Sequence, residues 1–222
     1  MSPKVFFITG TSTGFGNELV KKCISSGDKV VATARNSSKL SFPDTSKDNL
    51  LTVDLDVTQQ DSIHKAFDTA VKHFGRIDVV VNNAGYGLAG EFESLSDKQI
   101  RTQMEVNFFG LINVTRVALE TMRAQKPSGG LIQQITSIGG QRGVPFFTIY
   151  CASKWAVEGY TEALSQEVSF SLSPVTKVSL TFHSSNQNGT FTCNASSQVD
   201  SAPTGLVAAW TLARTRSQST TI

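Results

Sequence analysis

The stretch from Val5 to Val20, VFFITGTSTGFGNELV, joins an apolar run to a helical pattern through a glycine-rich turn. Val5 to Ile8 is continuously apolar, which is typical of a strand buried on both faces of a parallel sheet. Beyond the turn, apolar side chains recur at the spacing of one helical face: Leu19, Val20, Cys23 and Ile24. A strand, a glycine turn and a helix in this order predict an α/β fold.

The turn itself contains Gly10, Gly14 and Gly16. Glycine lets the backbone approach a ligand closely, and the free amides at the start of a helix attract phosphate groups. The context fits a dinucleotide-binding turn, although the spacing is Gly-x3-Gly-x-Gly and not the more common Gly-x-Gly-x2-Gly. We therefore predict a pyrophosphate site here, with a purely structural glycine turn as the alternative.

The second predicted strand, Lys29 to Arg35, ends where the adenosine ribose of a dinucleotide would lie, about 20 residues past the turn. A carboxylate at this position would accept a hydrogen bond from the 2′-hydroxyl of NAD, but the strand ends in Ala34 and Arg35. Because a guanidinium matches the charge and geometry of a phosphate, we favour NADP(H). The alternative is a solvated arginine with no ligand.

Further along the chain, apolar runs continue to alternate with helical patterns. We predict strands over 50–57, 77–81 and 130–135, a helix that ends at Phe74 before Gly75, and one long or two abutting helices over 96–125. Asp56, near the end of the third strand, is either an adenine contact or the N-cap of the next helix. The alternation predicts a doubly wound parallel sheet with helices on both faces, in one domain over residues 1–170.

Three side chains after the fifth predicted strand suggest chemistry. Ser137 follows that strand, and Tyr150 and Lys154 are four residues apart at the start of the next helical pattern. Positions i and i+4 share a helical face, so we expect the ammonium to favour the phenolate and to lower the pKa of the tyrosine. Such a tyrosine would serve as a proton donor and acceptor. The alternative is an ordinary surface pair.

Two other features depend on asparagine. Asn82-Asn83-Ala84-Gly85 follows the fourth predicted strand, and its small residues permit a tight turn where open parallel sheets bind ligands. Asn107 lies inside the helical pattern over 96–125, where asparagine competes with backbone hydrogen bonds. It is either a helix irregularity or a hydrogen-bonding group of the site.

Composition narrows the function. The chain has 222 residues, 17% charged residues and a net charge of +2, with no Lys/Arg block, which argues against nucleic acid or an anionic membrane as a partner. Neither a signal peptide nor a run of 18 apolar residues is apparent, so we expect a soluble cytoplasmic protein. We predict no metal site, because the cysteines and histidines lie at no ligand spacing: Cys23, Cys151, Cys193, His64 and His73.

Together these features resemble the short-chain dehydrogenase/reductase family over residues 4 to about 169. The matching positions are Thr9-Gly10-x3-Gly14-x-Gly16, Asp56, Asn82-Asn83-Ala84-Gly85, Asn107, Ser137 and Tyr150-x3-Lys154. The resemblance implies a Rossmann-type fold and hydride transfer between NADP(H) and an alcohol or carbonyl.

In the scheme of that family, Tyr150 is the general acid or base, Lys154 holds the nicotinamide ribose, and Ser137 donates a hydrogen bond to the substrate oxygen. Asn107 supports a water that links Lys154 to solvent. The resemblance implies these residues for cofactor binding: Gly10, Thr11, Gly14, Phe15, Gly16, Arg35, Asp56, Val57, Asn83, Tyr150 and Lys154.

Residues 31–35 and 83–87 are similar to NADP(H)-preferring members that act on lipophilic alcohols and ketones. An apolar rim suits a polyketide, steroid, retinoid or aryl ketone of secondary metabolism, or else belongs to the core or an interface: Tyr86, Leu88, Phe92, Val144, Phe146 and Phe147. The family implies a homodimer or homotetramer. The alternatives are a catalytically impaired NADP(H)-binding protein and an isomerase or dehydratase that retains the cofactor.

Residues 171–222 form a polar tail that departs from the family pattern. A strand is predicted over Lys177 to Phe182, but His183-Ser184-Ser185-Asn186 follows where the family has Pro-Gly. Ser201 to Arg216 suits a short helix, and we expect the remainder to be partly disordered. We expect such an end to come from a frameshift, a retained intron or a wrongly joined gene, which sequencing of the transcript would test.

Overall fold

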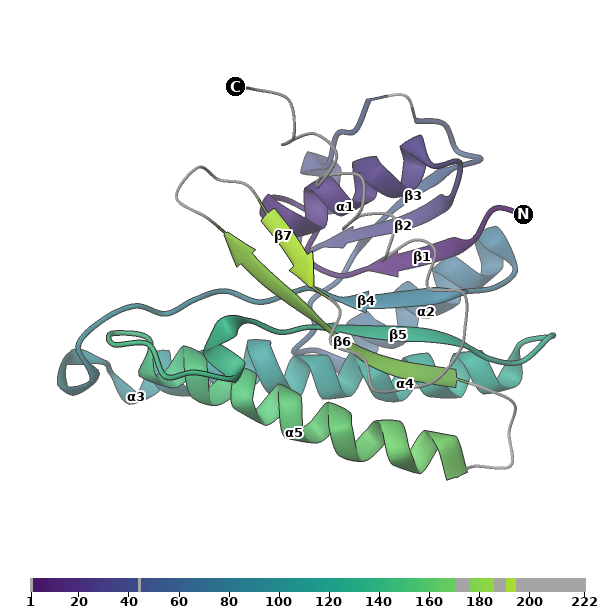
Figure 1. Ribbon diagram of the computed structural model, residues 1–222. Coiled ribbons are helices and arrows are strands. Elements are labelled where there is room, and N and C mark those ends of the chain that lie inside the picture. The colour runs from purple at the N-terminus through teal and green to yellow at the C-terminus, as the bar shows by residue number, and fades with distance from the viewer. Residues whose placement is uncertain (1, 44, 171–175, 186–190, 195–222) are drawn as a thin grey trace, which may run out of the picture.

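The computed structural model describes residues 2–43, 45–170, 176–185 and 191–194, and it forms a single sheet with helices on both faces (Figure 1). The sheet has the order β3-β2-β1-β4-β5-β6-β7, with every pair parallel except the last, which is antiparallel. The strands are β1 Val5–Ile8, β2 Lys29–Ala34, β3 Leu50–Asp54, β4 Val79–Asn82, β5 Gly130–Ile135, β6 Thr176–Ser185 and β7 Phe191–Asn194. The predicted Rossmann-type, doubly wound parallel sheet is confirmed.

Within the described residues, five α-helices connect these strands, two of them between β4 and β5: α1 Gly14–Ser25, α2 Gln60–Phe74, α3 Asp97–Met104, α4 Gly110–Ala124 and α5 Thr148–Phe170. Shorter turns of helix are η1 Ser37–Lys39, η2 Phe92–Ser94, the π-helix η3 Glu105–Phe109 and η4 Ile138–Gly140. None of the helices within the described ranges is long and apolar enough to cross a membrane.

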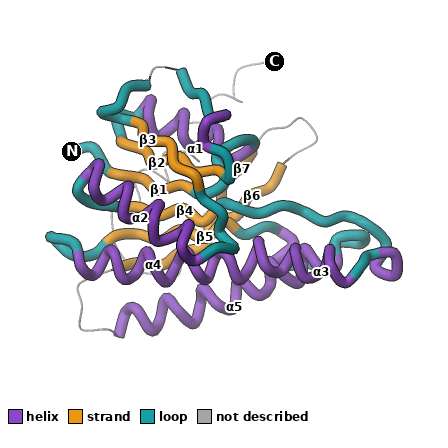
Figure 2. Tube along the Cα trace, turned by 180° about the vertical axis from the view of Figure 1, so that it is seen from behind, coloured by secondary structure: helices purple, strands orange, loops and turns teal. Residues whose placement is uncertain are grey.

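Alternate residues of β1 enter the two separate cores of the molecule. Phe6 and Ile8 pack with the buried face of α1, whereas Val5 and Phe7 pack with α2 and α4 on the opposite face of the sheet. Figure 2, seen from behind, shows α2 lying across the sheet on that second face, with α4 and α5 beside it. Burial on both faces explains why β1 is continuously apolar.

The chain reverses direction across the sheet between β1 and β4. From β1 it winds outward to β2 and β3, and it then returns to β4 on the other side of β1. The carboxyl ends of β1 and β4 therefore lie side by side, joined by a hydrogen bond from the Thr9 amide to the Val81 carbonyl (3.0 Å). Ligands of open α/β sheets bind at such a switch point.

Several predicted elements differ in extent. β2 ends at Ala34 and not at Arg35, and β4 covers Val79–Asn82 and not 77–81. β3 ends at Asp54 and not at residue 57, because Asp56 Oδ1 accepts hydrogen bonds from the Thr58 amide (2.9 Å) and hydroxyl (2.7 Å) and turns the backbone. Asp56 is thus not the N-cap, which is Gln59. The helix predicted over 96–125 is broken into α3 and α4 by η3.

In the C-terminal region, the strand predicted over Lys177 to Phe182 is confirmed as the centre of β6, which pairs with β5. The antiparallel strand β7 was not expected from the sequence. The helix predicted over 201–216 lies outside the described residues, and the division at residue 170 stays a prediction.

Candidate active site

The structure brings Ser137, Tyr150 and Lys154 together at the carboxyl end of β5. Ser137 follows the strand and caps η4, where its Oγ accepts a hydrogen bond from the Gly139 amide (3.2 Å). Tyr150 and Lys154 occupy the first two turns of α5. The Lys154 Nζ lies 5.8 Å from the centroid of the Tyr150 ring and donates a hydrogen bond to the Ile135 carbonyl (2.8 Å).

The expected lowering of the Tyr150 pKa is wrong for this structure. Burial raises the pKa of the phenol because it disfavours the phenolate, and a hydrogen bond with Ser137 only partly opposes this effect. Burial likewise lowers the pKa of Lys154 to about 8, although Glu158 acts to raise it. The Lys154 ammonium donates its hydrogen bond to the Ile135 carbonyl, and it is not among the groups that shift the pKa of Tyr150.

Asn107 is both an irregularity and a hydrogen-bonding group. It is 1% exposed and lies in the middle of the π-helix η3. Its Oδ1 accepts from the Tyr86 amide (3.0 Å), and its Nδ2 donates to the Tyr86 carbonyl (2.9 Å) and to the Ser153 hydroxyl (3.2 Å). The side chain therefore joins the segment after β4 to α5, and π-bulges of this kind are frequent at functional sites.

Gln103 is a site residue that the sequence analysis missed. It is fully buried, one turn before Asn107, and its Oε1 accepts from the Leu88 amide (2.7 Å) while its Nε2 donates to the Tyr86 carbonyl (2.7 Å). Gln103 and Asn107 together hold the backbone of residues 86–88. The sequence pattern that could have identified Gln103 is its distance of four residues from Asn107. This spacing places the two side-chain amides on one helical face, against the same neighbouring segment.

Residues 86–88 form a wall beside the tyrosine. A Cβ added to Gly87 would lie 3.4 Å from the Phe147 ring and 3.9 Å from the Tyr150 ring. Phe147 in turn meets Tyr150 edge-on, with ring centroids 6.0 Å apart. The two buried amides thus fix a segment that borders the phenol.

The glycine turn forms a cradle that fits a pyrophosphate. Gly10 has φ +69° and passes so close to the segment after β4 that a Cβ would lie 2.8 Å from Ala84 Cα. Gly14 has φ +61° and faces open space. At the start of α1, the Thr13 side chain makes no capping hydrogen bond and the first turn holds no acidic residue, which leaves the helix amides to a phosphate.

The other predicted cofactor residues lie around this cradle in different roles. Thr11 joins it to the end of β2 through its amide and hydroxyl, both bonded to the Thr33 carbonyl (2.9 and 3.1 Å). Asn83 donates from Nδ2 to the carbonyls of Thr9 and Gly10 (both 2.9 Å), so its amide supports the turn. Gly16 has no room for a Cβ, which would overlap the Gly10 carbonyl oxygen and the Asn83 amide.

Phe15 and Val57 have side chains buried in the two cores, so only their backbone can face a cofactor.

Arg35 follows β2 with an exposed side chain that makes no hydrogen bond or ion pair to any residue of the described ranges. Asp56 Oδ1 is committed to Thr58. After Arg35, the chain is anchored by the Ser37 amide, which donates to Asp54 Oδ1 (2.7 Å).

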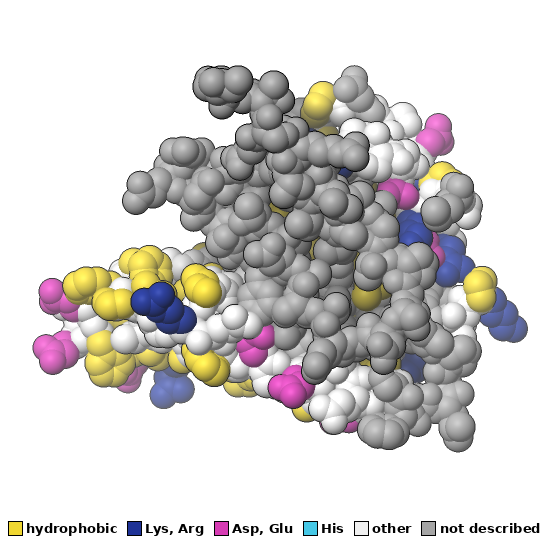
Figure 3. Space-filling model, in the orientation of Figure 1, with side chains coloured by type: hydrophobic (Ala, Val, Ile, Leu, Met, Phe, Trp, Pro, Cys, Tyr) yellow, Lys and Arg dark blue, Asp and Glu magenta, His cyan; other side chains and the backbone are white. Residues whose placement is uncertain are grey.

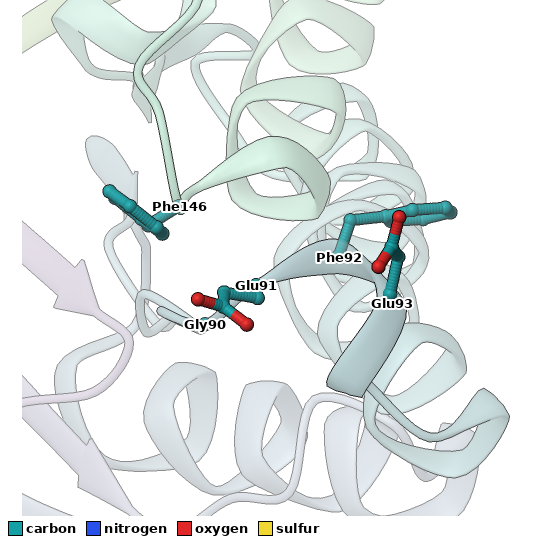
Figure 4. Close-up of a pocket in the computed structure, with 5 residues that line it drawn as sticks. All are labelled: Gly90, Glu91, Phe92, Glu93 and Phe146. Atoms are coloured by element: carbon teal, nitrogen blue, oxygen red, sulfur yellow. The ribbon is translucent and has the colours of Figure 1, made fainter.

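An open hollow of about 510 Å³ lies beyond this wall, lined by Gly90, Glu91, Phe92, Glu93 and Phe146. In Figure 4, Phe146 and Phe92 lie on opposite sides of the hollow, with Glu91 between them. The Gly90 amide donates to the Phe146 carbonyl (2.9 Å), and Phe146 adopts φ 65°, a conformation rare for a bulky residue. Figure 3 shows hydrophobic side chains gathered at the end of the molecule where, in Figure 1, the segment after β4 reaches α3.

The described part of the chain contains no group of three or more His, Cys, Asp or Glu side chains that could hold a metal ion.

The sequence matches the family model described as short chain dehydrogenase over residues 4–181. It is 42% identical over 168 residues to the oxidoreductase calM of Penicillium decumbens, an alignment that covers 73% of this chain and 55% of that protein. It is 40% identical over 168 residues to the 3-ketodihydrosphingosine reductase of Bacteroides thetaiotaomicron, covering 76% and 60% of the two chains.

Among solved structures, the chain is similar to ElxO with NADP bound, with a TM-score of 0.70, 29% identity, and coverage of 76% of this chain and 69% of that one. The chain spans little more than half the length of the two curated relatives. The family match covers well over half of this chain and ends inside β6, so it takes in the glycine turn, η3 and the Ser137, Tyr150 and Lys154 cluster. The chain belongs to the short-chain dehydrogenase/reductase family.

Proposed function

We propose that the protein is an NADP(H)-dependent oxidoreductase that interconverts a carbonyl and an alcohol of a small lipophilic substrate. The observation that carries the proposal is the arrangement at the end of β5, where the Tyr150 phenol bonds the Ser137 hydroxyl and the buried Lys154 ammonium lies 5.8 Å from the centre of the Tyr150 ring. A phenol whose pKa is raised by burial stays protonated at neutral pH, which is the state needed to donate a proton to a carbonyl oxygen.

Each side chain has a separate task in this reaction. NADPH, when bound at the glycine cradle, supplies the hydride. The Ser137 hydroxyl donates a hydrogen bond to the substrate oxygen, and Tyr150 gives that oxygen its proton. The Lys154 ammonium then stabilises the phenolate that remains. Asn107 has its amide bonded to Tyr86 and Ser153, which holds the wall over 86–88. Its support of a water that links Lys154 to solvent stays a prediction.

The choice of NADP(H) rests on Arg35. Its exposed guanidinium stands at the carboxyl end of β2 without a competing partner in the described residues, so it can reach a 2′-phosphate. ElxO, which is similar in fold, is described with NADP bound. The substrate class rests on the aromatic residues around the hollow and on a relative whose name is 3-ketodihydrosphingosine reductase.

A homodimer or homotetramer is proposed as the assembled form. Phe109 on η3 and Trp155 on α5 are 48% and 54% exposed, although these elements contact each other. Large exposed apolar side chains on adjacent helices are typical of an interface.

The test is NADPH consumption by the full chain against a panel of alkyl, aryl and polycyclic ketones, with NADPH binding measured in parallel. We expect turnover of at least one lipophilic ketone, and we expect Tyr150→Phe to lower kcat by about a thousandfold while NADPH binding is retained, because only the transferable proton is removed. Near wild-type turnover by Tyr150→Phe would contradict the role given to this residue.

NADPH binding without turnover of any carbonyl would instead support a nucleotide-binding protein without reductase activity. An isomerase or dehydratase would be recognised by product formation without net consumption of NADPH.

A further inference from the structure

One side chain links Lys154 to the residue directly before Ser137, and the proposed mechanism does not use it. Glu158 lies one turn after Lys154 on α5, at the spacing that places both on one helical face. Its Oε1 accepts a hydrogen bond of 2.6 Å from the hydroxyl of Thr136, the residue directly before Ser137. The Lys154 Nζ donates a hydrogen bond to the carbonyl of Ile135, the residue directly before Thr136 (2.8 Å). Two side chains from consecutive turns of α5 therefore hydrogen-bond to two consecutive residues at the end of β5, Ile135 and Thr136.

The fold leaves space for this carboxylate. A Cβ added to Gly140 would lie 2.8 Å from Thr136 Oγ1 and 3.0 Å from Glu158 Oε1 and Cγ. Any side chain at Gly140 would force Glu158 away from Thr136. The glycine thus allows η4, which Ser137 caps, to pack directly on the carboxylate.

Glu158 also provides the countercharge for Lys154. The lysine is 7% exposed, and its charge is disfavoured by burial. The charged side chains of α3 and η3, which pack against α5, are all exposed: Asp97, Lys98, Arg101 and Glu105. Arg142, which follows η4, is exposed as well. The carboxylate of Glu158 acts to raise the pKa of Lys154. Burial raises the pKa of Glu158 itself, and the hydrogen bond from Thr136 and the charge of Lys154 only partly oppose this effect.

We propose that Glu158 is a positioning residue for the reaction, which holds Thr136 and thereby Ser137 in place and keeps Lys154 protonated. The inference rests on the proposed function, because it assigns Glu158 to the same catalytic cluster. Tyr150, Lys154 and Glu158 then form one row along α5, in which the proton donor, its cation and the countercharge each lie one turn apart.

Glu158→Gln tests the electrostatic part. Glutamine keeps an oxygen that accepts from Thr136 and keeps the volume beside Gly140, but it carries no charge. Without the carboxylate the pKa of Lys154 falls, so the ammonium loses its proton at lower pH and the basic limb of the kcat profile moves to lower pH. We expect the ratio of the reductase rate at pH 9 to that at pH 7 to fall at least about threefold below the wild-type ratio.

The matched control is Glu162→Gln, one further turn along α5 and exposed, which should leave this ratio unchanged. The same ratio in wild type and in folded Glu158→Gln would overturn the electrostatic role. A second readout needs no turnover: the 13Cε resonance of Lys154 in the full chain should titrate at lower pH in Glu158→Gln than in wild type or Glu162→Gln. If the wild type reduces no ketone, the proposed function fails, whereas this titration still decides whether Glu158 controls Lys154.

Thr136→Val and Thr136→Ser test the positioning part and remain informative if Glu158→Gln does not fold. Valine removes the hydroxyl at nearly constant volume and should lower kcat about tenfold with little change in KM, since Ser137 is misplaced while the binding surfaces remain. Serine restores the hydroxyl and should return kcat to within about twofold of wild type. Equal kcat values for Thr136→Val and wild type would overturn this part.

Discussion

At the scale of single residues, the proposed preference for NADP(H) depends on Arg35. The end of β2 offers this guanidinium and no carboxylate, and the side chain is exposed without a partner among the described residues. The opposite holds for Tyr150 and Lys154, whose pKa values are governed by burial more than by each other. The charge of an exposed side chain is set by its own chemistry, whereas the charge of a buried one depends on desolvation and on its neighbours.

Arg35→Ala should weaken NADPH binding by about tenfold or more while NADH binding changes little. A charge-assisted hydrogen bond to the 2′-phosphate contributes about 1.5–3 kcal/mol, and NADH lacks that phosphate. Binding is measured by fluorescence titration of both cofactors. Lys39→Ala, in the exposed η1 turn, is the control and should affect both cofactors less. Equal losses for NADPH and NADH would remove the argument for NADP(H).

At the scale of elements, the π-helix η3 interrupts the helix over 97–124 and separates α3 from α4. η3 widens the helix at Asn107 and, with Gln103 one turn earlier, turns two buried amides toward residues 86–88. A regular helix pairs its own backbone N–H and C=O groups. The two amide side chains provide such partners for the backbone of residues 86–88, which has no regular secondary structure. The wall beside Tyr150 therefore depends on α3 and η3.

Gln103→Met should lower stability by about 1–3 kcal/mol and raise KM for a ketone substrate several-fold, with a smaller change in kcat. Methionine has a similar shape but leaves the buried Leu88 amide without its acceptor, so residues 86–88 lose their fixed position. Thermal unfolding and steady-state kinetics measure the two effects. Lys98→Met, on the exposed face of α3, should change neither. An unchanged KM in a folded Gln103→Met would show that the wall does not contribute to substrate binding.

At the scale of the whole molecule, the reversal between β1 and β4 places the glycine cradle beside the segment after β4. Asn83 ties the two together through Thr9 and Gly10, and the close approach of Gly10 to Ala84 leaves no space for a side chain. The catalytic cluster follows β5, the next strand in the sheet. The proposed cofactor cradle and the proposed proton donor therefore follow β1 and β5, the strands on either side of β4, while α5 and η3 expose apolar residues on the outside.

We expect the full chain to run in light scattering at two or four times the mass of one chain, and Phe109→Ser combined with Trp155→Ser to shift it toward the monomer. Both changes remove exposed apolar surface from elements that pack together. Phe92→Ser removes a ring of similar exposure from the hollow and should leave the assembly unchanged. A wild type that is monomeric at all concentrations would contradict the proposed interface.

Much of the fold was predictable because its signals are local. The apolar run of β1, the glycines after it and the helical spacing beyond depend only on neighbours in sequence, and β5 was predicted with the bounds that it has. The end of β3 was missed by a few residues because the Asp56 side chain, and not a helix cap, turns the chain.

The sequence by itself determined the order of strands and helices up to β6, and the spacing that places Tyr150 and Lys154 on one face of a helix. Only the tertiary structure decided their electrostatics, because desolvation depends on everything packed around a group, and it reversed the expected direction of the tyrosine pKa. It also decided the parts of Gln103 and Glu158, whose partners lie 15 and 22 positions away in the chain. Contacts of that range depend on how helices pack against the sheet, which no local pattern specifies.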